Sequence, residues 1–199
     1  MPLPPSIAVL ISGGGRTLLN LLDRIEQGSL RARIPLVIAS VECPGARRAR
    51  DRGLHVEVLP GVIPADQLAQ TLREHKIDWV VLAGYLKMLR IPAGYEHRVL
   101  NIHPALLPKY GGKGMFGHHV HEAVIRAGEK ESGCTVHFCD AKFDTGPIVL
   151  QRRCPVLPND TPETLAARVF EQECLAYPEA LQLVLSGNVT FDSASKPKP

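Results

Sequence analysis

The sequence is most restrictive in what it lacks. Its 199 residues contain no run of eighteen apolar residues, and the N-terminus has no cationic region followed by a long apolar segment. We therefore expect neither a membrane span nor a secretory leader, and predict a cytoplasmic protein without a membrane partner. A net charge of +3 without a basic run or basic-aromatic patch argues against nucleic-acid binding and mildly favours small anionic ligands.

Cysteine pairs with metal or redox spacing are also missing. The five cysteines are an odd number and contain no C-x-x-C motif, which disfavours a zinc or redox centre. Most are expected to be small buried hydrophobic residues. Cys139 has a second interpretation, as part of the wall of a ligand pocket.

Internal repeats and low-complexity linkers are absent, so one domain is expected. Hydrophobic residues make up 45% and charged residues 22% of the chain, as in ordinary globular proteins. A chain of this length buries about 70% of its unfolded surface. We predict one folded domain over residues 1–190 and a disordered tail over residues 191–199, where the sequence becomes polar and rich in Pro and Lys.

Apolar runs alternate with helical patterns in the first half of the chain, which predicts parallel strands joined by right-handed helical crossovers. The predicted strands are Ile7–Ser12, Pro35–Val41, His55–Leu59, Asp78–Ala83 and Val99–His103. The predicted helices between them are Thr17–Gln27, Pro44–Arg52 and Ala65–His75.

The second half of the chain has a different pattern. Gly133–Asp140 and Ile148–Val156 are predicted strands joined by a short loop, which favours antiparallel pairing. A long helix begins after an N-cap at Asp160 or Thr161 and runs to about Leu185, and a short strand follows Gly187. The fold class is therefore α/β, with a Rossmann-like, mostly parallel twisted sheet and helices on both faces.

The stretch Asn101-Ile102-His103-Pro104 contains the strongest catalytic candidates. Side chains two residues apart on a strand point to the same face, about 6.5 Å apart. The Asn amide can donate to a developing oxyanion and the His titrates near neutral pH, so the pair suits acyl transfer to an amine. The alternative is that both side chains only satisfy the local backbone.

The loop Ser12-Gly13-Gly14-Gly15-Arg16-Thr17 separates the first strand from the first helix, where glycines let backbone amides approach a phosphate. It is not a Walker A loop, and Leu18 stands where a dinucleotide fingerprint needs a third small residue. Glu42 ends the second strand, where a ribose-binding acid would stand in a dinucleotide fold. A mononucleotide phosphate is favoured over a dinucleotide, and a plain tight turn remains the structural alternative.

Three other features carry weaker signals. Asp144 is either a turn residue or a carboxylate that orients His103. The tract His118-His119-Val120-His121 has no ligand partners at metal spacing and is interpreted as a helix start. Glu173 falls on the sheet-facing stripe of the long helix with Leu165 and Val169, so it needs a cation or a ligand as its partner.

Together these motifs resemble the glycinamide ribonucleotide formyltransferases, folate-dependent enzymes of purine synthesis, from about Ile7 to Val189. The resemblance is carried by the glycine loop, Val81–Leu89, Asn101–Pro108, Val136–Phe138, Asp144–Pro147 and Gln172-Glu173. It implies transfer of the formyl group of 10-formyltetrahydrofolate to glycinamide ribonucleotide, by direct attack of the amine and without a metal. The implied partners are this nucleotide and a reduced folate, and the implied assembly is a monomer or a homodimer.

Residue roles follow from the resemblance. The implied catalytic residues are Asn101, His103 and Asp144. The implied nucleotide-binding residues are Gly14, Gly15, Arg16, Thr17 and Glu173. The implied folate-binding residues are Leu86, Lys87, Met88, Leu89, Cys139, Asp140, Ala141 and Asp144. The chain departs from the family at Arg16-Thr17, at Ala105 and in a longer loop from Gly111 to His119.

Other functions use similar residues. A methionyl-tRNA formyltransferase would have a second domain after the catalytic one, and a formyltetrahydrofolate hydrolase would have a regulatory domain before it. A further alternative is another formyltransferase that uses the same donor. Leu18 disfavours an NAD-dependent dehydrogenase, and the presence of Asn101, His103 and Asp144 disfavours a nucleotide-binding module with a degenerate site.

Overall fold

A computed structural model describes residues 3–195 of the chain. It contains seven strands and five helices within this range. The chain divides into two compact units, Met1–Asn101 and Ile102–Pro199, and strand β5 (Val99–His103) crosses the boundary. None of the helices in residues 3–195 is both long and apolar enough to cross a membrane.

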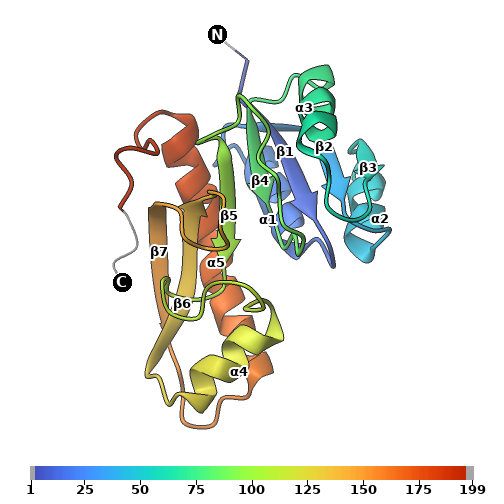
Figure 1. Cartoon of the computed structure of the whole chain (residues 1–199). Helices are drawn as coiled ribbons and strands as arrows, with labels where there is room; N and C mark the ends of the chain where they lie inside the picture. The colour runs from blue at the N-terminus through green and yellow to red at the C-terminus, as the bar shows by residue number, and fades with distance from the viewer. Residues whose placement is uncertain (1–2, 196–199) are drawn as a thin grey trace. The chain divides into compact units, whose positions relative to one another are not determined.

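The first unit is a parallel α/β layer (Figure 1). Its strand order is β3-β2-β1-β4-β5, and each neighbouring pair is parallel. The strands are β1 (Ser6–Ile11), β2 (Arg33–Ala39), β3 (Val56–Val58), β4 (Trp79–Leu82) and the start of β5. Every residue of β1 is buried, as expected for a central parallel strand covered on both faces.

Three helices connect these strands: α1 (Arg16–Glu26), α2 (Pro44–Asp51) and α3 (Ala65–Glu74). The connections through α1 and α2 step outward to β3, whereas α3 returns the chain to β4. Right-handed crossovers therefore place α1 and α2 on one face of the sheet and α3 on the other. This arrangement agrees with the predicted Rossmann-like fold.

The second unit contains an antiparallel pair and two helices. Strands β6 (Glu131–Phe138) and β7 (Ile148–Pro155) pair antiparallel, as their short connection predicts. Helix α5 (Pro162–Leu185) packs on both strands and on α4 (His118–Arg126) (Figure 1). Thr161 is the N-cap of α5 and forms a capping box with Thr164, which confirms the predicted helix start.

The C-terminal segment differs from the prediction. The chain after Gly187 forms turns rather than a strand, and within the predicted tail Ser195 makes an isolated antiparallel bridge with Ile148. The ring of Phe191 lies edge-on to that of Phe138, 5.5 Å away. Residues 191–195 are thus held by β6 and β7, and the rest of the predicted tail lies outside the described residues.

Candidate active site

The glycine loop lies at the carboxyl end of β1, where the strand order of the first unit reverses between β1 and β4. This switch point is where open α/β sheets bind ligands. Gly13, Gly14 and Arg16 are exposed, and the first turn of α1 contains no acidic residue. The half-buried Thr17 follows in the same turn. The loop therefore presents an open helix N-terminus that is suited to an anion.

Packing fixes the loop at Gly15. This residue has φ 72°, and a Cβ built on it would lie 2.7 Å from the Cα of Gly45 at the start of α2. A Cβ on Gly14 would meet only Nη1 of Arg48, at 3.9 Å. Gly15 is thus required by the fold, whereas Gly14 is free to act on a ligand.

The segment after β4, which the resemblance assigns to folate, lies beside the glycine loop in the first unit. The N–H of Leu86 donates to Oγ of Ser12 at 2.9 Å, and the N–H of Ser12 donates to the carbonyl of Gly84 at 3.1 Å. Lys87 is exposed, Met88 is half-buried, and Leu89 is buried. The side chain of Leu86 is 53% exposed, which leaves an apolar surface beside the loop.

The second unit contains a buried cluster formed by Asp144 and two histidines. Nδ1 of His103 lies 3.5 Å from Oδ2 of Asp144, and Nε2 of His137 lies 3.5 Å from Oδ1. The N–H of Gly112 donates to Oδ2 at 2.9 Å. The predicted approach of Asp144 to His103 is therefore present, with a second imidazole on the other carboxylate oxygen.

Backbone carbonyls fix both imidazoles. Nε2 of His103 lies 2.7 Å from the carbonyl of Tyr110, and Nδ1 of His137 lies 2.8 Å from the carbonyl of Phe138. A carbonyl can only accept, so these ring nitrogens donate. The nitrogens that face Asp144 then carry a proton only when the rings are cationic. A proton taken up by the cluster can therefore lie between a ring nitrogen and an oxygen of Asp144.

Burial sets the charge state of this cluster. Burial lowers the pKa of His103 from its ordinary 6.5, and the opposing effects of the Asp144 charge and the Tyr110 carbonyl do not cancel it. Burial would raise the pKa of Asp144, but the His137 hydrogen bond, the His103 charge and the Gly112 N–H lower it overall. The charge of Asp144 does raise the pKa of His103, as expected of a neighbouring carboxylate, but burial outweighs this effect, so Asp144 alone does not keep His103 charged at neutral pH.

The loop that carries Asp144 is held tightly. Asp144 has a left-handed backbone with φ 57°, and the carboxylate of Asp140 accepts from the N–H of Lys142 and the hydroxyl of Thr145. Ala141 is exposed in the same loop. Strain of this kind persists where the surrounding structure imposes it, which is common at functional sites.

Glu173 and Cys139 lie elsewhere in the second unit. Glu173 is half-buried on α5, on the stripe of the fully buried Leu165 and Val169. Burial raises the pKa of the Cys134 thiol on β6 to about 12, and the Glu173 charge adds to this effect. Burial likewise raises the pKa of Cys139, with smaller effects from Asp144 and Asp140, so neither thiol is a reactive thiolate.

The histidine tract does not form a ligand set. His118 faces Glu163, and the His119 ring packs edge-on against Phe116. His121 is 4% exposed on α4, its Nδ1 has no hydrogen-bond partner, and burial lowers its pKa to about 4. The helix start is confirmed, although His121 points into the protein instead of into solvent.

Sequence reasoning missed the second imidazole and the backbone groups of the cluster. Asn101 is half-buried on β5, two residues before His103, as expected. His137 was noticed only as part of a motif, because β6 is buried at seven of its eight residues and an inward His gives no periodic signal. The carbonyl of Tyr110 and the N–H of Gly112 have no side-chain signature at all.

Comparisons with known proteins identify the family of this chain. The formyl transferase family model matches residues 6–181. The chain therefore belongs to the formyl transferase family.

Several curated relatives, among them plant and bacterial proteins, are named phosphoribosylglycinamide formyltransferase. The one from Vigna unguiculata, named chloroplastic, is 40% identical over 195 residues, which are 93% of this chain and 62% of the relative. The one from Haemophilus influenzae is 35% identical over 192 residues, which are 92% of this chain and 88% of the relative. The chain thus spans less than two thirds of the plant relative and most of the bacterial one.

Solved structures give the same result. A glycinamide ribonucleotide transformylase 1 from Symbiobacterium toebii superposes with a TM-score of 0.89 at 34% identity, covering 99% of this chain and 95% of that chain. The mostly parallel α/β fold of this chain is therefore the fold of that transformylase.

Proposed function

We propose that this chain transfers the formyl group of 10-formyltetrahydrofolate to the primary amine of glycinamide ribonucleotide in purine biosynthesis. The observation that carries the proposal is the buried pairing of His103 with Asp144, within a segment that the formyl transferase model matches. The names of the plant and bacterial relatives support the choice of acceptor. Direct attack fits the cluster because it contains no thiolate or activated serine.

The reaction balances without a covalent enzyme intermediate. The amine nitrogen forms a bond to the formyl carbon, and the carbonyl oxygen becomes an oxyanion that the Asn101 amide stabilises. The neutral His103 with the ionised Asp144 takes the proton that the attacking nitrogen loses. The bond from carbon to N10 of the folate then breaks, and this proton goes to the departing nitrogen.

The binding assignments belong to the same proposal. Gly14, Gly15, Arg16 and Thr17 bind the nucleotide phosphate, and Glu173 binds its ribose. The folate ring binds Leu86, Lys87, Met88, Leu89, Cys139, Asp140, Ala141 and Asp144. The family match extends through both compact units, which supports one catalytic domain over residues 1–190 followed by a tail over 191–199.

Location and assembly are also proposals. We infer a cytoplasmic monomer or homodimer that binds neither nucleic acid nor membrane, on the basis of the mixed, mildly basic composition. The chloroplastic name of the Vigna unguiculata relative points to a second possible compartment. Fractionation of cells that produce the chain would distinguish the two.

The decisive assay mixes the protein with a 10-formyltetrahydrofolate donor, with and without glycinamide ribonucleotide, and follows donor loss and formylated nucleotide together. We expect donor loss only with the nucleotide, in equal amount to the product. Donor loss without nucleotide would identify a hydrolase. Loss only with a charged initiator tRNA would identify a tRNA formyltransferase.

A further inference from the structure

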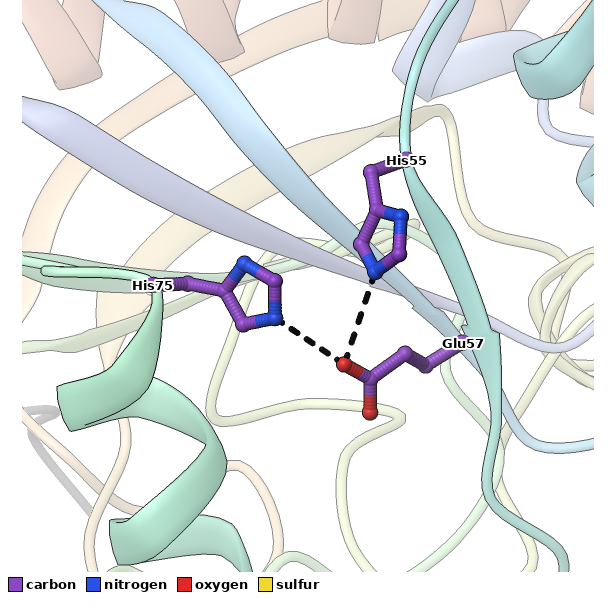
Figure 2. Close-up of side chains that lie close together, drawn as sticks. All are labelled: His55, Glu57 and His75. Atoms are coloured by element: carbon purple, nitrogen blue, oxygen red, sulfur yellow. Dashed lines mark hydrogen bonds and ion pairs between the residues drawn. The ribbon is translucent and has the colours of Figure 1, made fainter.

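A second cluster of two histidines and a carboxylate lies on the surface of the first unit, and none of its three residues is assigned to catalysis. Nε2 of His75 lies 3.0 Å from Oε1 of Glu57, and Nε2 of His55 lies 3.6 Å from the same oxygen. Figure 2 shows both rings directed at this single oxygen. In residues 3–195, no other group of three such side chains brings its ligand atoms within 4.8 Å of one another.

Two elements build this arrangement. Glu57 is the middle residue of β3, the strand at the end of the sheet, and His55 precedes it by two residues, so both side chains leave the same face. His75 is the C-cap of α3. The carbonyl dipoles at a helix C-terminus favour a cation there.

We propose that His55, Glu57 and His75 bind one Zn²⁺ ion. Zn–N and Zn–O bonds of about 2.0–2.1 Å in a tetrahedral site separate ligand atoms by about 3.3 Å. The observed separations of 3.0 and 3.6 Å bracket this value. Two imidazoles with one carboxylate are a ligand set for zinc-like ions, whereas Mg²⁺ and Ca²⁺ prefer oxygen ligands.

The site is accessible and is completed by solvent. The side chain of His55 is 58% exposed, and those of Glu57 and His75 are 28% and 26% exposed. The two rings are stacked with centroids 5.0 Å apart, and their Nε2 atoms both approach Oε1 of Glu57. Metal binding requires each Nε2 lone pair, so a neutral ring moves its proton to Nδ1 and a cationic ring releases one.

The ion would join the edge strand β3 to the C-terminal end of α3. His55 and Glu57 come before the connection to α3, and His75 follows α3, so one ion closes a loop of about twenty residues. An ion that binds the folded chain but not the unfolded one stabilises the folded state by mass action. The proposed role of the ion is therefore to stabilise the fold, and none of its three ligands is assigned to formyl transfer.

The test is calorimetric titration of chelator-treated protein with ZnCl₂. We expect one Zn²⁺ per chain, with affinity lowered at least about tenfold in each of His55→Ala, Glu57→Gln and His75→Ala, since even indirect partners of metal ligands give 10–100-fold losses. His118→Ala with His119→Ala is the matched control, because it removes two exposed histidines and should leave the affinity unchanged. Circular dichroism checks that each variant is folded. Because His55 is exposed, His55→Ala should remove a ligand without disturbing the core.

A second measurement separates a site from weak surface binding. Zn²⁺ should raise the melting temperature of the parent protein but not of His75→Ala, and MgCl₂ at the same concentration should have no effect. The proposal is overturned if the parent binds no Zn²⁺ with unit stoichiometry, if the three variants retain its affinity, if the control abolishes binding, or if Mg²⁺ stabilises equally.

Discussion

Two clusters in this chain have the same composition, two imidazoles around one carboxylate, but opposite surroundings. In the second unit, His103 and His137 approach different oxygens of Asp144, which is 9% exposed. In the first unit, His55 and His75 approach one oxygen of Glu57, which is 28% exposed. The first arrangement places a carboxylate between two rings, and the second gathers three ligand atoms, between which the proposed ion would lie.

The difference teaches that residue type alone does not decide chemistry. Around Asp144, Nε2 of His103 and Nδ1 of His137 donate to the carbonyls of Tyr110 and Phe138. The other nitrogen of each ring faces Asp144 and is protonated only when that ring is cationic. Around Glu57, the exposed ring of His55 and the half-buried ring of His75 would give up a proton to bind the proposed ion. Burial and the shared oxygen are therefore the two features on which we base different proposals, proton transfer at Asp144 and metal binding at Glu57.

The largest contrast should appear in turnover. Asn101→Ala, His103→Ala and Asp144→Asn should each reduce kcat at least about a hundredfold, because one oxyanion donor contributes about 10²–10³ and one acid or base about 10²–10⁴ in rate. His55→Ala and Glu57→Gln should retain normal turnover. Steady-state assays on all five purified variants check this. Normal turnover in any of the first three would remove that residue from its role.

Acid unfolding should show the next largest effect, through His121. Its folded pKa of about 4 lies below the ordinary 6.5, so the unfolded state binds more protons between these values. The stability present above pH 6.5 is therefore lost as the pH falls toward 4, by about 3 kcal/mol at about 1.36 kcal/mol per pH unit. His121→Leu should flatten this loss.

Denaturant titrations at several pH values provide the measurement for His121. His119→Leu, which replaces a neighbouring exposed histidine, is the control and should keep the slope of the parent protein. An unchanged slope in His121→Leu would mean that His121 is not the group that resists protonation. Asp144 cannot mimic the effect, because its lowered pKa acts only as the pH falls below about 3.8.

Variants of the glycine loop test whether backbone groups of the first unit bind the nucleotide phosphate. Gly15→Ala should reduce the free energy of unfolding by at least about 2 kcal/mol, since it combines left-handed strain with close packing on Gly45. Gly14→Ala should keep stability and weaken nucleotide binding, because its methyl group meets only Arg48. Melting curves and nucleotide calorimetry on both variants distinguish these outcomes. Weakened folate binding with normal nucleotide binding in Gly14→Ala would reverse the pocket assignment.

Much of the fold could be predicted because its signals are local. Thr161 and Pro162 mark the start of α5, and the run before Gly13 marks β1. The strand predicted after Gly187 was wrong, because a short apolar pattern does not show whether the segment has a neighbouring strand to pair with. The structure has turns there, and only Ser195 bridges to Ile148.

The site was predictable where neighbouring residues carry it. Asn101 and His103 lie on one strand, and the alternation that places His55 with Glu57 was present in the predicted strand His55–Leu59. His75 and His137 were missed because each approaches a carboxylate from a different segment of the chain. His75 lies 18 residues after Glu57, and His137 lies 7 residues before Asp144. Such contacts depend on helix crossovers and loop conformation, which local patterns do not specify.

The smallest effect is expected at Glu173, the third carboxylate that the resemblance assigns to a site. Glu173→Gln keeps the shape of the side chain and removes its charge, so nucleotide affinity should fall by about 1–3 kcal/mol while the fold stays intact. Its charge reaches Cys134 on β6, which gives a structural role as the competing explanation. The exposed Glu171 on the same helix provides a control, and Glu171→Gln should change neither property. A lowered melting temperature with unchanged nucleotide affinity in Glu173→Gln would mean that the carboxylate supports the packing of α5 on β6 instead of binding the ribose.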